Sequence, residues 1–425
     1  MKVAVLGSGP LALEVSLDLQ SVGASVKLIG KNLPGGHLLY LSEKLPELEL
    51  DFNCISTTLG RQVAGSSLEG PTSVENIFNE YYAPIIKKLQ QDNIVQNREV
   101  LRVQKQFLEL DETIEKRSRL FDLFRVTTGL NPSGMVEEQL QQNPELRERI
   151  GEDILASLKN RVESFEDFDL VIDARGDFQR SLALGAGGHY ALNEQALSGH
   201  GPLHYGLLQN EQIAEIDSLK NVSIVGSGYT AAVNLCLLEQ WLNADDSRVI
   251  NIVTTEEVAF RKLLKADNTP TLIKEGVKRI IKKQMNDWRT ECERVEKEIL
   301  HWRGLEGHER MKASPPEFPS PKISLYEGYT VTSVDRLLDQ ESTFITLEIP
   351  SWRNLKEAKD LITLSQDFII GSRGFAKKDD VIGPMQDDEP GFFELSGAGN
   401  LSSGLEKIKL IKSAIFDYFS RADGA

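Results

Sequence analysis

Two short glycine-rich segments contain the residues whose types and spacing are best suited to chemistry. They are Gly7-Ser8-Gly9-Pro10-Leu11-Ala12 and Gly226-Ser227-Gly228-Tyr229-Thr230-Ala231. In a turn of this type the first glycine allows a tight bend, and the second lets the backbone approach a pyrophosphate. The final small residue lets the following helix pack closely on a strand, and the N-terminus of that helix attracts an anion. Each segment therefore predicts a dinucleotide-binding turn, and the pair is stronger evidence than either alone.

The elements around each turn have the order that such a site requires. Residues 3–6 form a short apolar run typical of a buried parallel strand, residues 11–23 follow a helical pattern, and residues 25–30 form a second strand. The same order of strand, glycine turn, helix and strand returns at residues 221–255. Two such units far apart in one chain predict an α/β fold with two Rossmann-like dinucleotide-binding domains.

A second pair of segments also matches within the chain. Residues 167–178 and 365–375 each place Asp before an apolar strand, followed by a small residue, Arg-Gly and Phe. We interpret each as a late strand of its own domain, turning at a glycine towards the cofactor crevice. Arg175 and Arg373 follow these strands, and pairing with a carboxylate or with a phosphate is open for both.

The composition excludes several function classes. The chain has 425 residues with a formal net charge of −16, which argues against nucleic acid or an anionic membrane as the main partner. No apolar run approaches the ~20 residues that span a bilayer, and no secretory signal precedes the strand that starts at Lys2, so we expect a cytoplasmic protein. The three cysteines form no CxxC, so we expect neither a dithiol of that type nor a metal site.

Taken in chain order, these motifs resemble those of the FAD-dependent pyridine nucleotide oxidoreductases, the flavoproteins with two dinucleotide-binding domains. GSGPLA, the strand VKLIG and the pair Gly35-Gly36 resemble the family's FAD motif, and GSGYTA resembles its NAD(P)H motif. VIDARG and FIIGSRG resemble its two late strands, with Arg where the family has Thr. GFFELSGAGNLSSGL resembles the motif that holds the flavin ribityl chain.

The resemblance covers nearly the whole chain and implies one domain inserted in the other. The FAD domain would comprise residues 1–215 and 380–425, and the NAD(P)H domain residues 216–379. The residues implied to contact FAD are Gly7, Ser8, Gly9, Pro10, Leu11, Ala12, Lys31, Gly36, His37, Val100, Ala174, Gly176, Gly397 and Asn400. Those implied to contact NAD or NADP are Gly226, Gly228, Tyr229, Thr230 and Ala231.

Two carboxylates of the family pattern are absent. The acid that binds the adenosine ribose should lie at Gly30 or Lys31, and Ala398 stands where the late motif usually has Asp. We therefore expect FAD to be held more weakly, and expect Gly30→Glu to tighten it. In the second domain Glu256 favours NAD, whereas Arg261 or Lys262 would favour NADP.

These features predict a soluble flavoprotein that passes a hydride from NAD(P)H to FAD and then to an acceptor that the sequence does not name. One alternative is a non-catalytic sensor or scaffold that has lost its flavin, which Gly30 and Ala398 favour. Another is a flavin-dependent hydroxylase. No catalytic residue is identified, because His37 and His189 each follow a glycine pair and fit an ordinary loop position as well as a flavin site. The substrate and the oligomeric state stay open.

Overall fold

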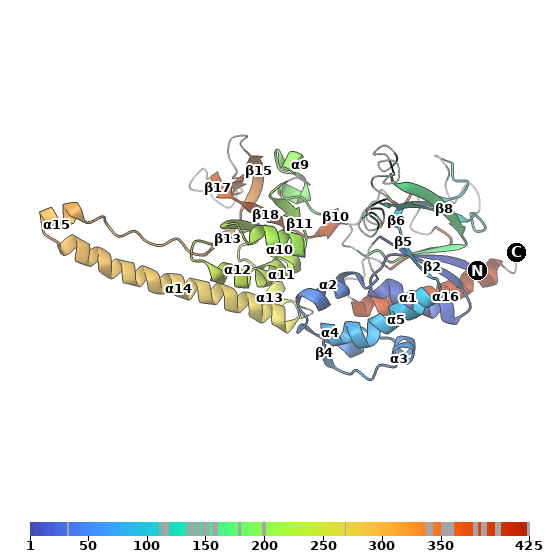
Figure 1. The fold of residues 1–425 in the computed structure, drawn as a ribbon. Helices are drawn as coiled ribbons and strands as arrows, with labels where there is room; N and C mark the ends of the chain where they lie inside the picture. The colour runs from blue at the N-terminus through green and yellow to red at the C-terminus, as the bar shows by residue number, and fades with distance from the viewer. Residues whose placement is uncertain are drawn as a thin grey trace. The chain divides into compact units, whose positions relative to one another are not determined.

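The chain folds as two compact units, of which the second is inserted in the first. Unit 1 comprises Met1–Gln179 and Lys377–Ala425, and unit 2 comprises Arg180–Ala376 (Figure 1). The computed structural model describes the chain apart from residues 32–33, 110–111, 113–118, 133–135, 137–139, 141–142, 144, 146–149, 151–153, 155–159, 177–179, 198–200, 268, 337–342, 350–360, 377–380, 384–388, 396–400 and 423–425, and apart from the side chains of 401–402 and 416–422.

Unit 1 is built on a parallel sheet of five strands. Their order is β20 (Phe392–Glu394), β9 (Leu170–Asp173), β1 (Lys2–Leu6), β2 (Ser25–Gly30) and β5 (Val95–Asn97), and every neighbouring pair is parallel. The apolar run at residues 3–6 is fully buried because β1 lies at the centre of the sheet. The carboxyl ends of these strands therefore meet at one edge.

The helices of unit 1 include α1 (Pro10–Ser21), which starts with proline at a position where the missing N–H group costs nothing. The long C-terminal helix α16 (Leu401–Ala422) packs on α1, and Lys412 Nζ donates to Asp18 Oδ1 at 2.8 Å. The other helices are α2 (Gly36–Lys44), α3 (Thr58–Ala64), α4 (Val74–Ile77), the π-helical turn η2 (Phe78–Tyr82) and α5 (Ala83–Gln91).

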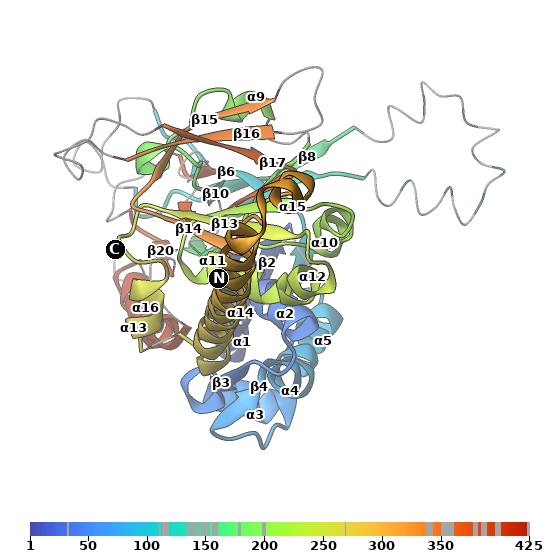
Figure 2. The ribbon, with the colours of Figure 1, turned by 90° about the vertical axis from the view of Figure 1, so that its left-hand side faces the viewer.

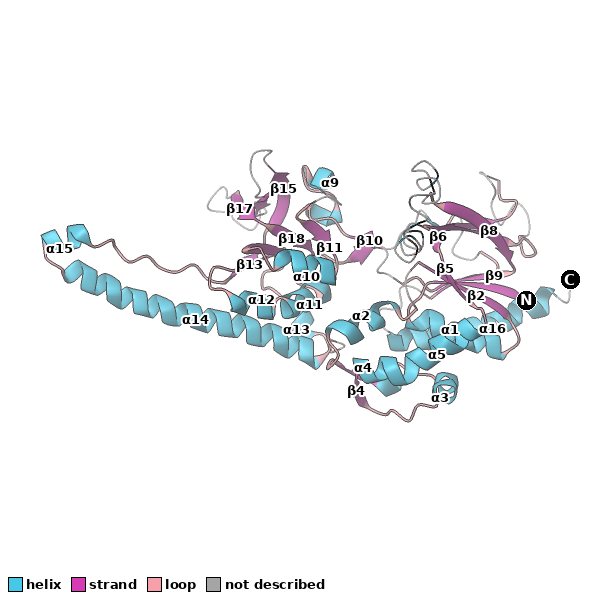
Figure 3. Cartoon of the chain, viewed as in Figure 1, coloured by secondary structure: helices cyan, strands magenta, loops and turns pink. Residues whose placement is uncertain are grey.

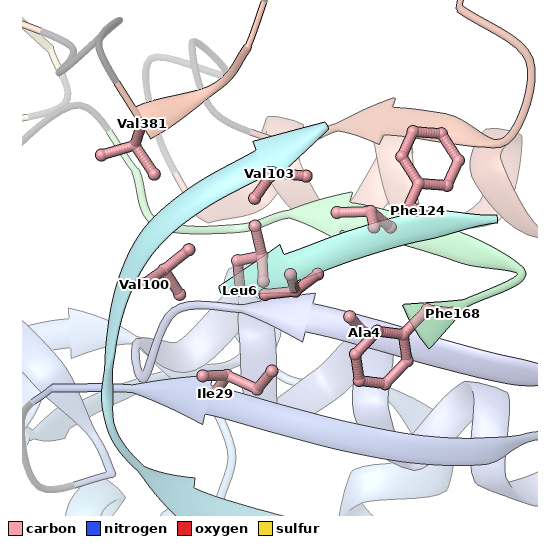
Figure 4. Close-up of a cluster of buried hydrophobic side chains, with 10 residues drawn as sticks. Ala4, Leu6, Ile29, Val100, Val103, Phe124, Phe168 and Val381 are labelled. Carbon is pink, nitrogen blue, oxygen red and sulfur yellow. The ribbon is translucent and has the colours of Figure 1, made fainter. Parts of the chain in front are cut away.

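A three-stranded antiparallel meander packs on the sheet of unit 1. It consists of β6 (Glu99–Lys105), β7 (Phe124–Leu130) and β8 (Val162–Phe168). Side chains of the sheet and of the meander form one buried apolar cluster, drawn in Figure 4. A short hairpin of β3 (Glu49–Asp51) and β4 (Pro71–Ser73) and the 3₁₀ turn η1 (Phe52–Cys54) complete the unit.

Unit 2 repeats the plan of unit 1. Its parallel sheet has the order β11 (Leu203–Tyr205), β18 (Phe368–Gly371), β12 (Asn221–Val225), β13 (Val249–Thr254) and β14 (Ile323–Glu327). A meander of β15 (Thr330–Arg336), β16 (Thr343–Glu348) and β17 (Ile362–Gln366) packs on it through a second apolar cluster. A short pair, β10 (Arg180–Ser181) and β19 (Phe375–Ala376), lies at the ends of the insertion.

One helix of unit 2 continues far beyond its sheet. Helix α14 (Thr271–Gly304) has 34 residues and packs against α11 (Tyr229–Leu237) near its start (Figure 3). Figure 2 looks nearly along α14. The extended segment that returns from α15 (Gly307–Lys312) lies along it, since Trp288 and Trp302 donate indole hydrogen bonds to carbonyl groups of residues 319 and 313. The remaining helices are α9 (Glu194–Leu197), α10 (Asn210–Ile216), α12 (Glu239–Ala244), α13 (Arg261–Lys265) and the 3₁₀ turn η3 (Ala186–Gly188).

The predicted α/β fold class is confirmed, but the domain boundary differs from the prediction. The sequence places the start of the inserted domain at residue 216, whereas residues 180–215 belong to unit 2. The physical reason is strand β11, which pairs with β18 in the second sheet. At three residues, this strand is too short to give a recognisable pattern in the sequence.

Candidate functional site

The two glycine turns occupy equivalent places in their sheets. Gly7 N donates to Ile29 O at 2.8 Å, and Gly226 N donates to Val253 O at the same distance. Each turn thus follows the central strand and is tied to the neighbouring strand that comes next in the chain. Helices α1 and α11 begin directly after the turns, with Gly9 and Gly228 as their N-caps.

The first glycine of each turn is fixed by its surroundings. Gly7 has φ +125° and Gly226 has φ +132°, a region that residues with a side chain rarely adopt. A Cβ atom at Gly7 would overlap the carbonyl oxygen of Ala174, and one at Gly226 would overlap that of Ser372. Only glycine fits at either position, because the late strand of each sheet passes directly beside the turn.

The second glycine of each turn has the opposite environment. An added Cβ at Gly9 or at Gly228 would meet no protein atom within 4 Å. The fold itself therefore does not require glycine there, whereas a ligand approaching the backbone would. In unit 1 the N-terminus of α2 also lies beside the turn, since a Cβ at Gly36, its first residue, would lie 3.0 Å from Gly9 Cα. Two helix N-termini thus converge on the first turn, and the arrangement fits a pyrophosphate.

The other predicted residues of unit 1 lie around this turn in different ways. Ser8 O accepts a hydrogen bond from Gly35 N at 2.7 Å, and Ala12, in the first turn of α1, is fully buried. Pro10 starts α1, and the Leu11 side chain lies against Gly404 of α16. Ala174 and Gly176 follow β9. Ala174 lies against Gly7, and Gly176 has a left-handed φ of +74°.

The side chains of three further predicted residues, Val100, Lys31 and His37, have different surroundings. The side chain of Val100 belongs to the apolar cluster of unit 1, so a nucleotide would meet only its backbone. Lys31 is 69 % exposed, with Nζ 3.9 Å from Glu99 Oε2. His37 stacks on Tyr40, and burial lowers the His37 pKa to about 4, which leaves it neutral at pH 7. Gly397, Ala398 and Asn400 lie outside the described residues.

The end of β2 explains why no acid stands at Gly30. A Cβ at this position would lie 2.9 Å from Ser8 Cβ and 3.1 Å from the carbonyl carbon of Gly7. Contacts below 3.0 Å force a shift, and here the turn itself would have to move. The expectation that Gly30→Glu tightens FAD is therefore not supported, because the new side chain would displace the backbone of the glycine turn.

In unit 2 the turn opens onto a cavity of about 120 Å³. Its walls come from the turn, from the ends of β12, β13 and β18, and from the start of the meander. The lining includes Gly226, Ser227, Gly228, Thr254, Thr255, Tyr329 and Arg373. Thr230 and Ala231 are buried in α11, and burial raises the pKa of Tyr229 to about 12.

The acid and the base that the sequence connects with nucleotide choice lie side by side. Glu256 follows β13, and its Oε1 lies 3.2 Å from Lys262 Nζ. Its other oxygen is buried, and no donor of the described residues reaches it. Lys262 is largely exposed on α13, one residue after Arg261. A carboxylate at this strand end is the residue type that binds a ribose diol in dinucleotide sites, but here the oxygen without a donor is buried and Glu256 is not among the residues that line the cavity.

The two arginines of the internal match differ. Arg175 forms a two-point ion pair with Asp173, with Nε–Oδ1 and Nη2–Oδ2 distances of 2.9 and 2.8 Å. Arg373 instead donates to the carbonyl oxygens of Leu184 and Gly185. The first arginine therefore has a structural role, and the second lines the cavity of unit 2.

One buried polar cluster was not predicted from the sequence. Glu14 of α1 is 2 % exposed and accepts hydrogen bonds from Tyr81 Oη at 2.6 Å and Thr57 Oγ1 at 2.7 Å. Burial raises the Glu14 pKa from its ordinary value of 4.5 to about 7. The only signal in the sequence is an acid within an apolar helical stretch, since its partners lie far along the chain.

No helix in the described part of the chain is both long and apolar enough to cross a membrane. No protein-family model matches the chain, and no curated protein matches it. Among solved structures it is similar to bacillithiol disulfide reductase Bdr (YpdA) from Staphylococcus aureus, with 10% identity, a TM-score of 0.54 and 98% of each chain covered.

Two further structures are similar over nearly their whole length. Ornithine N-hydroxylase (KtzI) from Kutzneria sp. 744 has 13% identity and a TM-score of 0.50, with 96% of this chain and 99% of that chain covered. Thioredoxin reductase from Lactococcus lactis has 10% identity and a TM-score of 0.50, with 99% of both chains covered. Together with the two glycine turns, these likenesses confirm the predicted resemblance in fold: the chain has the fold of the flavoproteins with two dinucleotide-binding domains.

Proposed function

We propose that the protein is an FAD-dependent oxidoreductase that passes a hydride from NAD(P)H to flavin and then to an acceptor still to be identified. The observation that carries this proposal is the duplicated turn. In each copy the first glycine is fixed by protein contacts, and the second faces open space that a phosphate would fill. Two such turns suit one nucleotide that donates a hydride and one that accepts it.

Each unit contributes binding groups of its own. In unit 1 the backbone amides at the N-termini of α1 and α2 would bind the pyrophosphate of FAD. In unit 2 the turn, the cavity and Glu256 would bind NADH or NADPH. A bound flavin supplies the hydride chemistry itself, so the protein residues need mainly to bind and orient. His37 is neutral at pH 7 and adds no positive charge beside the first turn.

The acceptor is constrained by what the sequence lacks. The chain has no CxxC, so a relay through a dithiol of that spacing is not proposed. The similar structures include both disulfide reductases and a hydroxylase, and a hydroxylase therefore stays a candidate. A second candidate of another class, a sensor that has lost its flavin, is favoured by Gly30, because the strand end carries no ribose acid.

The colour of the purified protein tests the proposal. We expect a flavin absorbance spectrum, or uptake of added FAD by the colourless protein, and bleaching of the flavin by NADH or NADPH without oxygen. A protein that takes up no FAD at millimolar concentration would contradict the proposal and favour the sensor. Oxygen consumption that depends on a third compound would identify the hydroxylase.

A further inference from the structure

An arginine follows the late strand of each unit, Arg175 after β9 and Arg373 after β18, but only Arg175 forms an ion pair with an acid on its own strand. In unit 1 the arginine is neutralised by Asp173, two residues before it on β9. In unit 2 the matching position on β18 is Gly371. A Cβ at Gly371 would lie 2.6 Å from the ring of Tyr205 and 3.0 Å from Leu184. The fold therefore excludes an acid at this position, and the matching counter-ion of Arg373 is absent.

The position of Arg373 is fixed by the loop at residues 184–191. Its Nη1 donates to the carbonyl oxygens of Leu184 and Gly185. That loop is held in turn by the fully buried Glu194, whose carboxylate accepts from Leu184 N at 2.8 Å, Ala191 N at 2.6 Å and Tyr205 Oη at 2.5 Å. With three donors the Glu194 carboxylate orients the loop; it forms no ion pair with Arg373, but its charge acts on the guanidinium and partly offsets the lowering of the Arg373 pKa by burial.

Arg373 is one of the residues that line the cavity containing the second glycine turn. Among the residues that the structure describes, no carboxylate forms an ion pair with Arg373, and both of its recorded acceptors are neutral carbonyls bonded to Nη1. Burial lowers the pKa of Arg373, and the nearby charge of Glu194 offsets this effect only in part, so an anion in the cavity would stabilise the guanidinium further. A planar guanidinium held by one edge leaves its other N–H groups to bind two oxygens of a phosphate.

We propose that Arg373 binds the pyrophosphate of the nucleotide that enters this cavity. This inference rests on the proposed function, because it takes NAD(P)H as the ligand of unit 2. Gly228 would admit the pyrophosphate to the backbone from the side of β12, and Arg373 would contact it from the side of β18. The arginine that replaces the family's threonine thus adds a charge contact to the backbone contacts of the turn.

Calorimetry with two variants tests the proposal. Arg373→Gln removes the charge, and Arg279→Gln removes a charge of the same unit on α14, where Arg279 is paired with Glu239 at the surface. We expect Arg373→Gln to weaken NADPH and NADH about 10–100-fold, the effect of one charged hydrogen-bonding partner. Arg279→Gln should leave both affinities unchanged. Added salt should weaken nucleotide binding to the wild type more than to Arg373→Gln.

A comparison of ligands separates this contact from a purely structural role of the loop. Adenosine and nicotinamide riboside carry no phosphate, so their affinities should not change in Arg373→Gln. Equal weakening of these ligands and of NADPH would assign Arg373 to loop structure and overturn the inference. Unchanged NADPH binding in the variant would also overturn it while leaving the proposed function intact. If the wild type binds neither NADH nor NADPH, the proposed function itself fails.

Discussion

The buried acid Glu14 makes the stability of unit 1 depend on pH. Its carboxylate lies between α1, the N-cap of α3 and η2, and the groups that face it are Tyr81, Thr57 and, more distantly, Asp18. The Tyr81 hydroxyl packs closely on Gly60, since a Cβ at Gly60 would overlap it. Glu14→Gln keeps the shape of the side chain and removes its ionisation.

The magnitude follows from the raised pKa. Because the folded state holds the proton more tightly than the unfolded state, the contribution to stability is fully present below pH 4.5. It is lost as the pH rises through about 7. The difference between 4.5 and about 7 corresponds to about 3 kcal/mol, at about 1.4 kcal/mol per pH unit. We therefore expect wild-type unit 1 to lose about this much between pH 4.5 and 8 relative to Glu14→Gln.

Urea unfolding at pH 5, 6, 7 and 8 measures this difference. Hydrogen exchange of peptides from α1 and α3 reports on unit 1. Tryptophan fluorescence reports on unit 2, because Trp241, Trp288, Trp302 and Trp352 all lie there. The fluorescence transition should show the same pH dependence in wild type and variant. If hydrogen exchange of the α1 peptides changed with pH in the same way in wild type and Glu14→Gln, the reasoning would be refuted, because ionisation of Glu14 would then not lower the stability of the folded state.

Two further predictions concern the glycines and the acid of the nucleotide sites. Gly9→Val should abolish binding of FAD and Gly228→Val binding of NAD(P)H, each with a loss of stability below about 1 kcal/mol. Gly7→Ala should lower the stability by more than about 1 kcal/mol, because Gly7 has φ +125° and the new Cβ would overlap Ala174. Calorimetry measures the binding and urea unfolding measures the stability. Glu256→Gln should shift the ratio of NADH to NADPH affinity about tenfold towards NADPH, since it removes a charged partner of the ribose and frees Lys262; an unchanged ratio would exclude Glu256 from the nucleotide site.

The parts of the fold that the sequence predicts are those in which local geometry selects the residue type. Gly7 and Gly226 are glycines because their φ angles and the adjacent carbonyls permit nothing else. The strands before them are apolar because central parallel strands are buried on both faces. The order of turn, helix and strand could therefore be predicted, together with the duplication.

The remaining features depend on contacts between residues far apart in the chain. Glu14 accepts a hydrogen bond from Tyr81, 67 residues away in the sequence, and no local sequence pattern predicts this contact. The domain boundary depends on β11 joining a strand that comes more than 160 residues later. The absence of an acid two residues before Arg373 is explained only by Tyr205, which lies beside Gly371 in the folded chain. In each case the sequence shows the residue, and the tertiary packing decides its role.

Strands β2 and β13, the second strands of the two units, end differently beside their glycine turns. In unit 2 Thr254 Oγ1 lies 2.8 Å from Ser227 Oγ and accepts a hydrogen bond from Glu256 N at 3.1 Å, so side chains join the strand end to the turn and orient the acid. In unit 1 Gly30 packs directly on Ser8 with no space for a side chain. In unit 1 the strand end thus packs closely on the turn and carries no acid. Under the proposed function, a nucleotide bound there would depend on its phosphates, and a side chain introduced at Gly30 would press on Ser8 and on the backbone of Gly7.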